Sequence, residues 1–270
     1  MESPFTRRRP GDGRIIYQLK LNGREEIDRV IDALQPVRPD AIDVNCGCPA
    51  PLIKRGGYGT GLFCDPGRCE TVFSGVRRHW DGPFFVKCRL GIQRRGWKEH
   101  FVGFLRICEQ CGVDALVVHP RFGDEKLKRR ARTDTYEWIA EQTAIPVIAN
   151  GDISSLAQCD DPAFRPVRGF MIGRMAVVQP WIFSGKSRED LDYREIWNRY
   201  FDYCTEDFPP ERAIGRIKEF TTYYARNFLF GQQLYGAVQS AETLESCFKR
   251  ANAFLCASPK ISSAPGVAGI

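Results

Sequence analysis

Short apolar runs alternate with segments of helical spacing over the first two thirds of the chain. After the run AIDVN, for example, Val72, Val76 and Trp80 recur on one face of a predicted helix. Apolar strands that alternate with amphipathic helices are typical of a parallel sheet covered by helices, so the pattern predicts an α/β fold. The six expected strands are Arg14–Leu21, Ala41–Asn45, Phe84–Leu90, Ala115–His119, Pro146–Asn150 and Gly169–Gly173.

The pattern changes after Trp181, where no further strand is predicted. The remaining apolar residues recur at helical spacing, which indicates a small all-helical domain. Its expected helices are Glu189–Phe208, Glu211–Phe228, Gln232–Val238 and Ala241–Cys256, and those of the first part are Arg24–Leu34, Pro66–Trp80, Trp97–Cys111, Thr133–Thr143 and Ser154–Cys159.

These patterns predict four parts. A flexible basic lead-in covers 1–13, and a parallel (β/α) barrel of the TIM type covers 14–186. A complete barrel of this type has eight strands, so six expected strands indicate an incomplete one. The helical domain covers 187–258, and the segment 259–270 is expected to be a disordered tail.

The composition is that of a soluble protein with a sizeable core. Of the 270 residues, 43% are hydrophobic, and no apolar run approaches the ~20 residues that span a bilayer. The start has no apolar region after its arginines, so a secretory signal is not expected. The eleven cysteines lie mostly within apolar patterns, which favours reduced thiols and a cytoplasmic location. The net charge of +6 permits a polyanionic partner.

Each predicted strand carries a polar residue that a buried strand does not need. In a parallel barrel the carboxyl ends of the strands converge on the face where active sites are built. Taken singly, each residue has an ordinary interpretation, such as a lysine at a sheet edge or a turn of the NGD type. Together they predict one site: Gln18, Asn45, Lys87, His119, Asn150, Gly151, Asp152, Gly173 and Arg174.

The chemistry of this set suits a phosphorylated flavin. Lys87 supplies a cation for the pyrimidine end of the ring, and Gln18 supplies an amide for the ring edge. The glycines and Arg174 offer backbone N–H groups and a guanidinium to a phosphate. The Gly-rich run 57–61 does not directly join a strand to a helix, so a dinucleotide-binding loop is disfavoured.

A turn follows the second strand and displays Cys46 and Cys48. Their spacing, with Cys108 and Cys111, could belong to a zinc site. Cys108 lies on a helix leading into a strand, at the opposite end of the unit, so no metal is expected. A buried, inert cysteine is the ordinary alternative for Cys48.

Several segments match a known family in order and separation. They are DVNCGCP (43–49), GGYGTGLF (56–63), VKCRLG (86–91), VVHPR (117–121), IANGDI (148–153) and MIGR with PWIF (171–183). On these segments the chain resembles the tRNA-dihydrouridine synthases. Only thirteen residues precede the first expected strand, so the family's first two strand–helix units are expected to be lacking. Cys46 stands where the family often has Met.

The resemblance implies an FMN enzyme that reduces uridine in tRNA to 5,6-dihydrouridine, with NADPH reducing the flavin. It makes Cys48 the general acid for C5 of the base, with hydride passing to C6, and it makes Asn45 a residue that positions the base. An ordinary thiol, with a pKa of about 8.5, is mostly protonated at neutral pH and can donate. The nine polar residues named above, apart from Asn45, then fall at flavin-site positions.

A basic segment follows the fourth strand, with six Lys and Arg between residues 121 and 132. On the active-site face such a segment could contact tRNA phosphates, and the expected contacts are Arg121, Lys128, Arg129 and Arg130. A second basic run, with Tyr223 and Tyr224 beside it, lies on a predicted helix and comprises Arg212, Arg216, Lys218 and Arg226. The protein is expected to be a monomer.

Two other functions stay open at this point. A flavin oxidoreductase acting on a free pyrimidine would not need the helical domain. A non-catalytic RNA-binding remnant would bind tRNA without retaining flavin. The basic segment favours a function with RNA over the free pyrimidine.

Overall fold

The computed structural model describes residues 11–125, 129–263 and 265. Their contacts form two compact units. The sheet unit holds the described residues up to Ile153 together with Ala157–Met171, and the helical unit holds mainly those from Ile172 on. This division comes earlier in the chain than the boundary predicted after Lys186.

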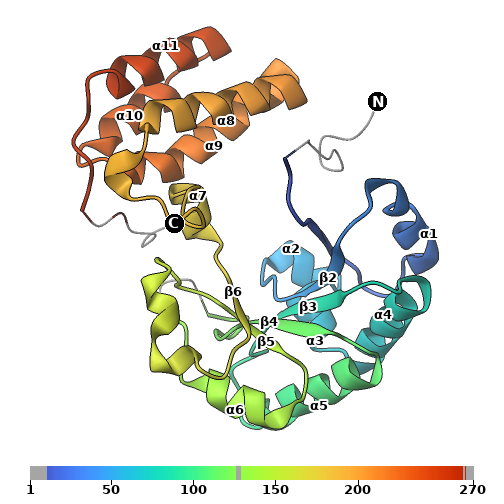
Figure 1. Cartoon of the computed structure of the whole chain (residues 1–270). Coiled ribbons are helices and arrows are strands. Elements are labelled where there is room, and N and C mark those ends of the chain that lie inside the picture. Colours follow the sequence, from blue (N-terminus) through green and yellow to red (C-terminus); the bar gives the residue numbers. More distant parts are fainter. Residues whose placement is uncertain (1–10, 126–128, 264, 266–270) are drawn as a thin grey trace. The chain divides into compact units, whose positions relative to one another are not determined.

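A single parallel sheet forms the sheet unit, and its strand order follows the order of the chain. Each strand pairs only with its neighbours in sequence, so β1 and β6 are the edges of the described sheet (Figure 1). The prediction of an incomplete α/β barrel with six parallel strands is confirmed. The strands are β1 Ile16–Leu19, β2 Ala41–Cys46, β3 Phe84–Arg89, β4 Ala115–His119, β5 Val147–Asn150 and β6 Gly169–Met171.

Helices α4, α5 and α6 lie along the outer side of the curved sheet (Figure 1). Helix α4 begins where Pro66 follows Asp65, whose carboxylate accepts a hydrogen bond from the Arg68 N–H at 3.1 Å. The sequence did not predict α2 and α3, and the short helix expected from Ser154 is a 3₁₀ turn over Ala157–Asp160. The helices are α1 Ile27–Asp32, α2 Pro51–Arg55, α3 Thr60–Phe63, α4 Pro66–His79, α5 Trp97–Gln110 and α6 Thr135–Gln142.

Side chains alternate between the two faces of the sheet. On the four inner strands β2–β5 the residues on the outer face are apolar and buried; an example is Phe84, whose ring centroid lies 6.0 Å from that of Phe73 on α4. The strand register places the polar residues together on the inner face. Gln18 pairs with Asp43, Asn45 pairs with Lys87, and Arg89 pairs with His119.

The helical unit contains α7 Arg174–Val178, α8 Tyr193–Asp207, α9 Pro210–Tyr224, α10 Gly231–Gln239 and α11 Leu244–Leu255. Trp197 anchors its core: the side chain is fully buried, and Nε1 donates to Thr221 Oγ1 at 2.9 Å. Tyr224 is also fully buried and donates to the Tyr193 carbonyl, so it is not available as an RNA contact.

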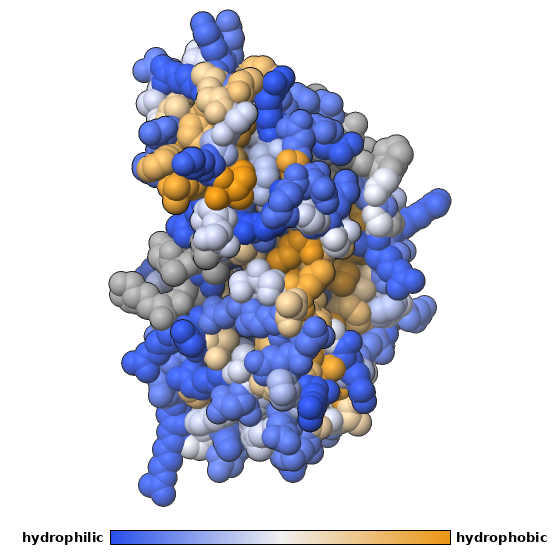
Figure 2. Space-filling model, turned by 60° about the vertical axis from the view of Figure 1, so that its left-hand side comes forward, coloured by the Kyte–Doolittle hydropathy of each residue, from blue (hydrophilic) through white to orange (hydrophobic). Residues whose placement is uncertain are grey.

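Hydrophobic residues are also exposed, and Figure 2 shows them as patches among hydrophilic ones on one face of the molecule. In the helical unit the exposed residues include Leu229, Phe230 and Tyr235. Part of the segment for which the sequence predicts a disordered tail is paired. Ile261 forms an antiparallel bridge with Phe228, and the Leu229 N–H donates to the Lys260 carbonyl at 2.9 Å. No helix in the described ranges is long and apolar enough to cross a bilayer.

The buried indole gives a test of the helical core. Trp197→Ala should lower the free energy of unfolding by about 3–5 kcal/mol, because it leaves a cavity and removes the N–H that donates to Thr221 Oγ1. Leu229→Ala, at an exposed position, should change it by less than about 0.5 kcal/mol. Urea unfolding, monitored by far-UV circular dichroism so that the signal does not depend on the removed indole, measures both. Equal effects of the two changes would contradict this view of the core.

Candidate active site

The turn after β2 is built by the side chain of Asn45. Its Oδ1 accepts the backbone N–H groups of Gly47 at 3.1 Å and Cys48 at 2.9 Å. Cys46, the last residue of β2, is fully buried on the outer face, and burial raises its thiol pKa well above the usual value. Cys48 is only partly buried. The turn therefore brings one thiol of the pair within reach of a ligand and leaves the other in the core.

The Gly-rich segment holds Cys48 from the other side. The backbone N–H and the hydroxyl of Thr60 both donate to the Cys48 carbonyl, at 3.0 and 3.2 Å. Gly59 has φ +57°, and a Cβ there would lie 2.5 Å from the same carbonyl oxygen. Glycine is therefore required for the close approach of the two segments. Asn22 secures the segment to the end of β1 by donating to the Gly56 carbonyl at 2.8 Å.

A chain of side-chain hydrogen bonds crosses the inner face from β1 to this turn. Asn45 Nδ2 donates to Gln18 Oε1 at 2.7 Å, and Gln18 Nε2 donates to Asp43 Oδ2. Gln18 is exposed, while Asp43 is 2% exposed. Sequence reasoning named Gln18 and Asn45 but missed Asp43. The available signal was a carboxylate within an otherwise apolar strand, the same signal that identified Lys87.

Asp43 is buried and Lys87 is half-buried, and these opposite charges lie on neighbouring strands. Burial raises the pKa of Asp43 to about 7, and the contact with Gln18 and the charge of Lys87 offset part of that rise. Burial also lowers the pKa of Lys87, against the attraction of Asp43. The two opposite charges thus offset part of each other's cost of burial.

His119, at the end of β4, is held in the neutral form. Burial, together with the positive charges of Arg89, Lys87 and Arg121, lowers its pKa to about 3. Arg121 Nη1 lies 2.8 Å from His119 Nε2, and a guanidinium can only donate. His119 Nε2 must therefore accept, so the ring proton sits on Nδ1. Nδ1–H is then a donor in a strongly positive part of the site.

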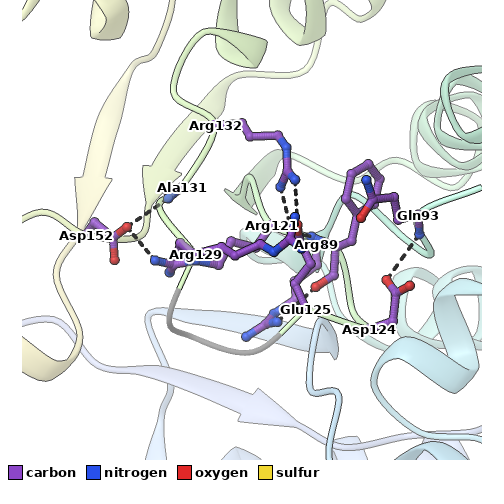
Figure 3. Close-up of polar contacts among 10 residues, drawn as sticks. Arg89, Gln93, Arg121, Asp124, Glu125, Arg129, Ala131, Arg132 and Asp152 are labelled. Carbon is purple, nitrogen blue, oxygen red and sulfur yellow. Dashed lines mark hydrogen bonds and ion pairs between the residues drawn. The ribbon is translucent and has the colours of Figure 1, made fainter. Parts of the chain in front are cut away.

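Arg121 has a different role from the predicted tRNA contact. It is 1% exposed, and Nη2 forms an ion pair with Asp152 Oδ2 at 2.5 Å (Figure 3). Its Nε donates to the Arg129 carbonyl, and Asp152 Oδ2 also accepts the Ala131 N–H at 2.8 Å. Such burial argues against a phosphate contact for Arg121. Arg121 and Asp152 instead fasten the basic segment to the ends of β4 and β5.

Glu125 neutralises another part of the basic segment. Its carboxylate accepts from both Arg132 Nη1 and Nη2, at 2.6 and 2.5 Å (Figure 3). This bidentate pairing lowers the pKa of Glu125 to about 2. Arg129 lies 3.8 Å from the same carboxylate but keeps 69% of its side chain exposed, and Arg130 is exposed. Lys128 lies outside the described residues. Arg129 and Arg130 thus stay predicted tRNA contacts.

The remaining predicted residues fall into both units. Asn150 Nδ2 donates to the Met171 carbonyl at 2.7 Å, which links β5 to β6. Gly151 has φ +111°, and a Cβ there would lie 2.5 Å from His119 Cδ2. Gly173 and Arg174 belong to the helical unit, where they begin α7. Their place in a phosphate site stays a prediction.

The inner face of the sheet unit therefore presents donors: the ammonium of Lys87, the Nδ1–H of His119, and the second N–H of the Gln18 amide. This set fits a ligand with acceptor groups along one edge and negative charge, as a flavin mononucleotide has. It does not resemble a metal site. Within the described part of the chain, no group of three or more His, Cys, Asp or Glu side chains is placed to hold a metal ion.

The close contact at Gly59 gives a test of the turn. Gly59→Ala should destabilise the protein by more than about 1 kcal/mol, because the backbone is left-handed there and the Cβ meets the Cys48 carbonyl. The matched control is Gly103→Ala, at an exposed position of α5 with no atom within 4 Å of the added Cβ. It should stabilise by about 0.5–1 kcal/mol. Urea unfolding measures both, and a neutral Gly59→Ala would contradict the contact.

The state of His119 gives a test of the site's electrostatics. Long-range ¹H–¹⁵N spectra of the imidazole should show the Nδ1–H tautomer and no titration between pH 5 and 8. Arg121→Met should raise the pKa of His119, because it removes a cation 2.8 Å from the ring. A midpoint near 6.5 in the unaltered protein, or a proton on Nε2, would disagree with this geometry.

Comparison with known proteins agrees with the motifs. A tRNA-dihydrouridine synthase B from Shewanella oneidensis is 35% identical over 162 residues, covering 58% of this chain and 48% of that protein. Its counterpart from Proteus vulgaris is 32% identical over 224 residues, covering 80% of this chain and 64% of that protein. The chain thus spans about half to two thirds of the length of these relatives.

Among solved structures, an old yellow enzyme from Trypanosoma cruzi matches with a TM-score of 0.45 and 11% identity, over 60% of this chain and 48% of that one. The family model of the dihydrouridine synthases matches residues 7–212, which include all described residues of the sheet unit and the first part of the helical unit. The protein belongs to the dihydrouridine synthase family.

Proposed function

We propose that this protein reduces uridine in tRNA to 5,6-dihydrouridine, with FMN as its bound cofactor and NADPH as the reductant. The observation that carries the proposal is the fixed, partly exposed Cys48. Asn45 and Thr60 hold its backbone, and Asn45 also touches Gln18 on the inner face. A thiol is thus tied to the same face as the donors that suit a flavin.

Different residues of the inner face would bind different parts of FMN. Lys87 offers its charge to the pyrimidine end of the ring, and Gln18 offers an amide N–H to the ring edge. His119 Nδ1–H, with Arg89 nearby, favours negative charge such as a phosphate. When bound, FMN supplies the hydride that C6 of the uracil ring accepts.

Cys48 completes the reduction. Its thiol gives a proton from Sγ to C5, so the C5–C6 double bond gains one hydride and one proton and the thiolate remains. Solvent returns the proton to the thiolate. Asn45 has its Oδ1 occupied by the turn and one Nδ2–H occupied by Gln18. Its second Nδ2–H is what it can offer to a carbonyl of the base.

The basic segment supplies the contacts with the tRNA backbone. Arg129 and Arg130 are exposed, and their backbone is held at the sheet end by Arg121 and Asp152. Lys128 lies between described parts of the same segment. A uridine within folded tRNA must leave its stack to reach the thiol, so these cations hold the neighbouring phosphates while it does.

The test uses the whole chain, loaded with FMN and supplied with NADPH and unmodified tRNA. Formation of dihydrouridine is followed by nucleoside mass spectrometry as a gain of two hydrogens. Cys48→Ala should reduce the rate at least about a hundredfold, the range for a lost general acid, while FMN binding is kept. Cys64→Ala removes an exposed thiol from the end of α3 and should leave the rate unchanged.

Other results would favour other functions. A flavin-loaded protein that reduces free uracil but leaves tRNA unchanged would favour an oxidoreductase of free pyrimidines. A protein that binds tRNA but takes up no FMN would favour an RNA-binding function without catalysis. Full activity in Cys48→Ala would contradict the role of this thiol.

A further inference from the structure

Asp43 is a buried acidic residue that has no role in the proposed reaction. It is 2% exposed and lies in the middle of β2, with its side chain on the inner face. Its Oδ2 accepts from Gln18, and its Oδ1 has no hydrogen-bond partner among the described residues. A carboxylate in this position costs folding free energy, so a function for it is expected.

Asp43, Gln18 and Asn45 form a chain of hydrogen bonds. The groups at the two ends of this chain fix which atom donates and which accepts in each bond. At one end the backbone N–H groups of Gly47 and Cys48 can only donate, so Asn45 must turn Oδ1 toward them. Asn45 Nδ2 then faces Gln18 Oε1. At the other end Asp43 Oδ2 accepts, so Gln18 must turn Nε2 toward it.

Asp43 Oδ2 can accept this bond in either charge state. Burial places the pKa of the carboxyl at about 7, so a proton is present part of the time at neutral pH. Because Oδ2 is engaged by Gln18, the proton is placed on Oδ1, which has no hydrogen-bond partner among the described residues. The acceptor at Oδ2, and with it the orientation of the amide chain, is then independent of the charge on Asp43.

We propose that Asp43 is a positioning residue that fixes the orientation of the Gln18 amide and, through Asn45, ties the cofactor-facing edge of the sheet to the Cys48 turn. The inference rests on the proposed function in one respect, namely that Gln18 faces FMN. With Nε2 held by Asp43, the second N–H of Gln18 points away from the carboxylate as a donor for the ligand. Without Asp43 the amide can rotate and present its oxygen instead.

Two substitutions at residue 43 separate the acceptor from the charge. Asp43→Ala removes the acceptor, while Asp43→Asn removes the charge and keeps an oxygen that can face Gln18. The readout without cofactor is the ¹⁵N spectrum of side-chain amides, with the Gln18 and Asn45 signals assigned by their loss in Gln18→Met and Asn45→Ala. Asp43→Ala should shift both signals, and Asp43→Asn should leave them near their original positions.

A second readout is the affinity for FMN, measured by quenching of flavin fluorescence on the apo-protein. Asp43→Ala should weaken binding about fivefold to tenfold, as expected when one aligned hydrogen bond is lost, and Asp43→Asn should restore it to within about twofold. In Gln18→Met, Asp43→Ala should have a smaller further effect than in the unaltered protein, because only the charge interaction of Asp43 with Lys87 is left to lose. Asp40→Ala, at an exposed position just before β2, where Oδ2 accepts the Ile15 N–H, is the matched control.

The outcomes separate this inference from the proposed function. Unmoved Asn45 signals in Asp43→Ala, or an unchanged affinity for FMN, would overturn the role of Asp43. Failure of the unaltered protein to bind FMN would overturn the proposed cofactor, while the amide spectra would still decide the role of Asp43. Should Asp43→Ala not fold, carboxyl ¹³C titration in Gln18→Met decides: the Asp43 midpoint should rise, because a donor to it is lost, and a constant midpoint would overturn the proposal.

Discussion

Two hydrogen bonds, from the backbone N–H groups of Gly47 and Cys48 to Asn45 Oδ1, determine the position of the Cys48 thiol. Each contributes about 1 kcal/mol net, but an unmet N–H in a tight turn costs more than that, so the turn has few alternatives. The other hydrogen bond of Asn45, to Gln18, and the bond from Thr60 to the Cys48 carbonyl hold the same turn. The position of Cys48 is therefore set by hydrogen bonds to backbone groups and not by ion pairs.

The alternation of side chains in parallel strands explains which parts of the site could be predicted. Gln18, Asn45, Lys87 and His119 interrupt apolar runs, and the register does bring them to one face. Asp43 interrupts its run in the same way, but its task depends on an amide on the neighbouring strand. A pattern along one strand shows that a polar residue is buried. It does not show which group across the sheet that residue meets.

In the basic segment, the sequence pattern indicated a function for residues that the fold uses for structure. Six cations within a short stretch indicate nucleic acid, yet Arg121 pairs with Asp152, which lies 31 residues later. Such a contact depends on the packing of two strand ends, and no local pattern reveals it. Glu125 similarly engages Arg132. What sequence reasoning treated as one charged surface is divided by the fold into cations that hold the loop and cations, such as Arg130, that stay exposed.

The strand order of the sheet has a consequence for how the protein forms. Since every described strand pairs with the strand next to it in the chain, each pairing closes only the one connection between two successive strands. The entropy of closing such a loop is modest compared with that of sheets whose neighbours are distant in sequence. A nucleus can therefore arise from any one βαβ segment, and during synthesis each new strand can add to the edge left by the strand before it.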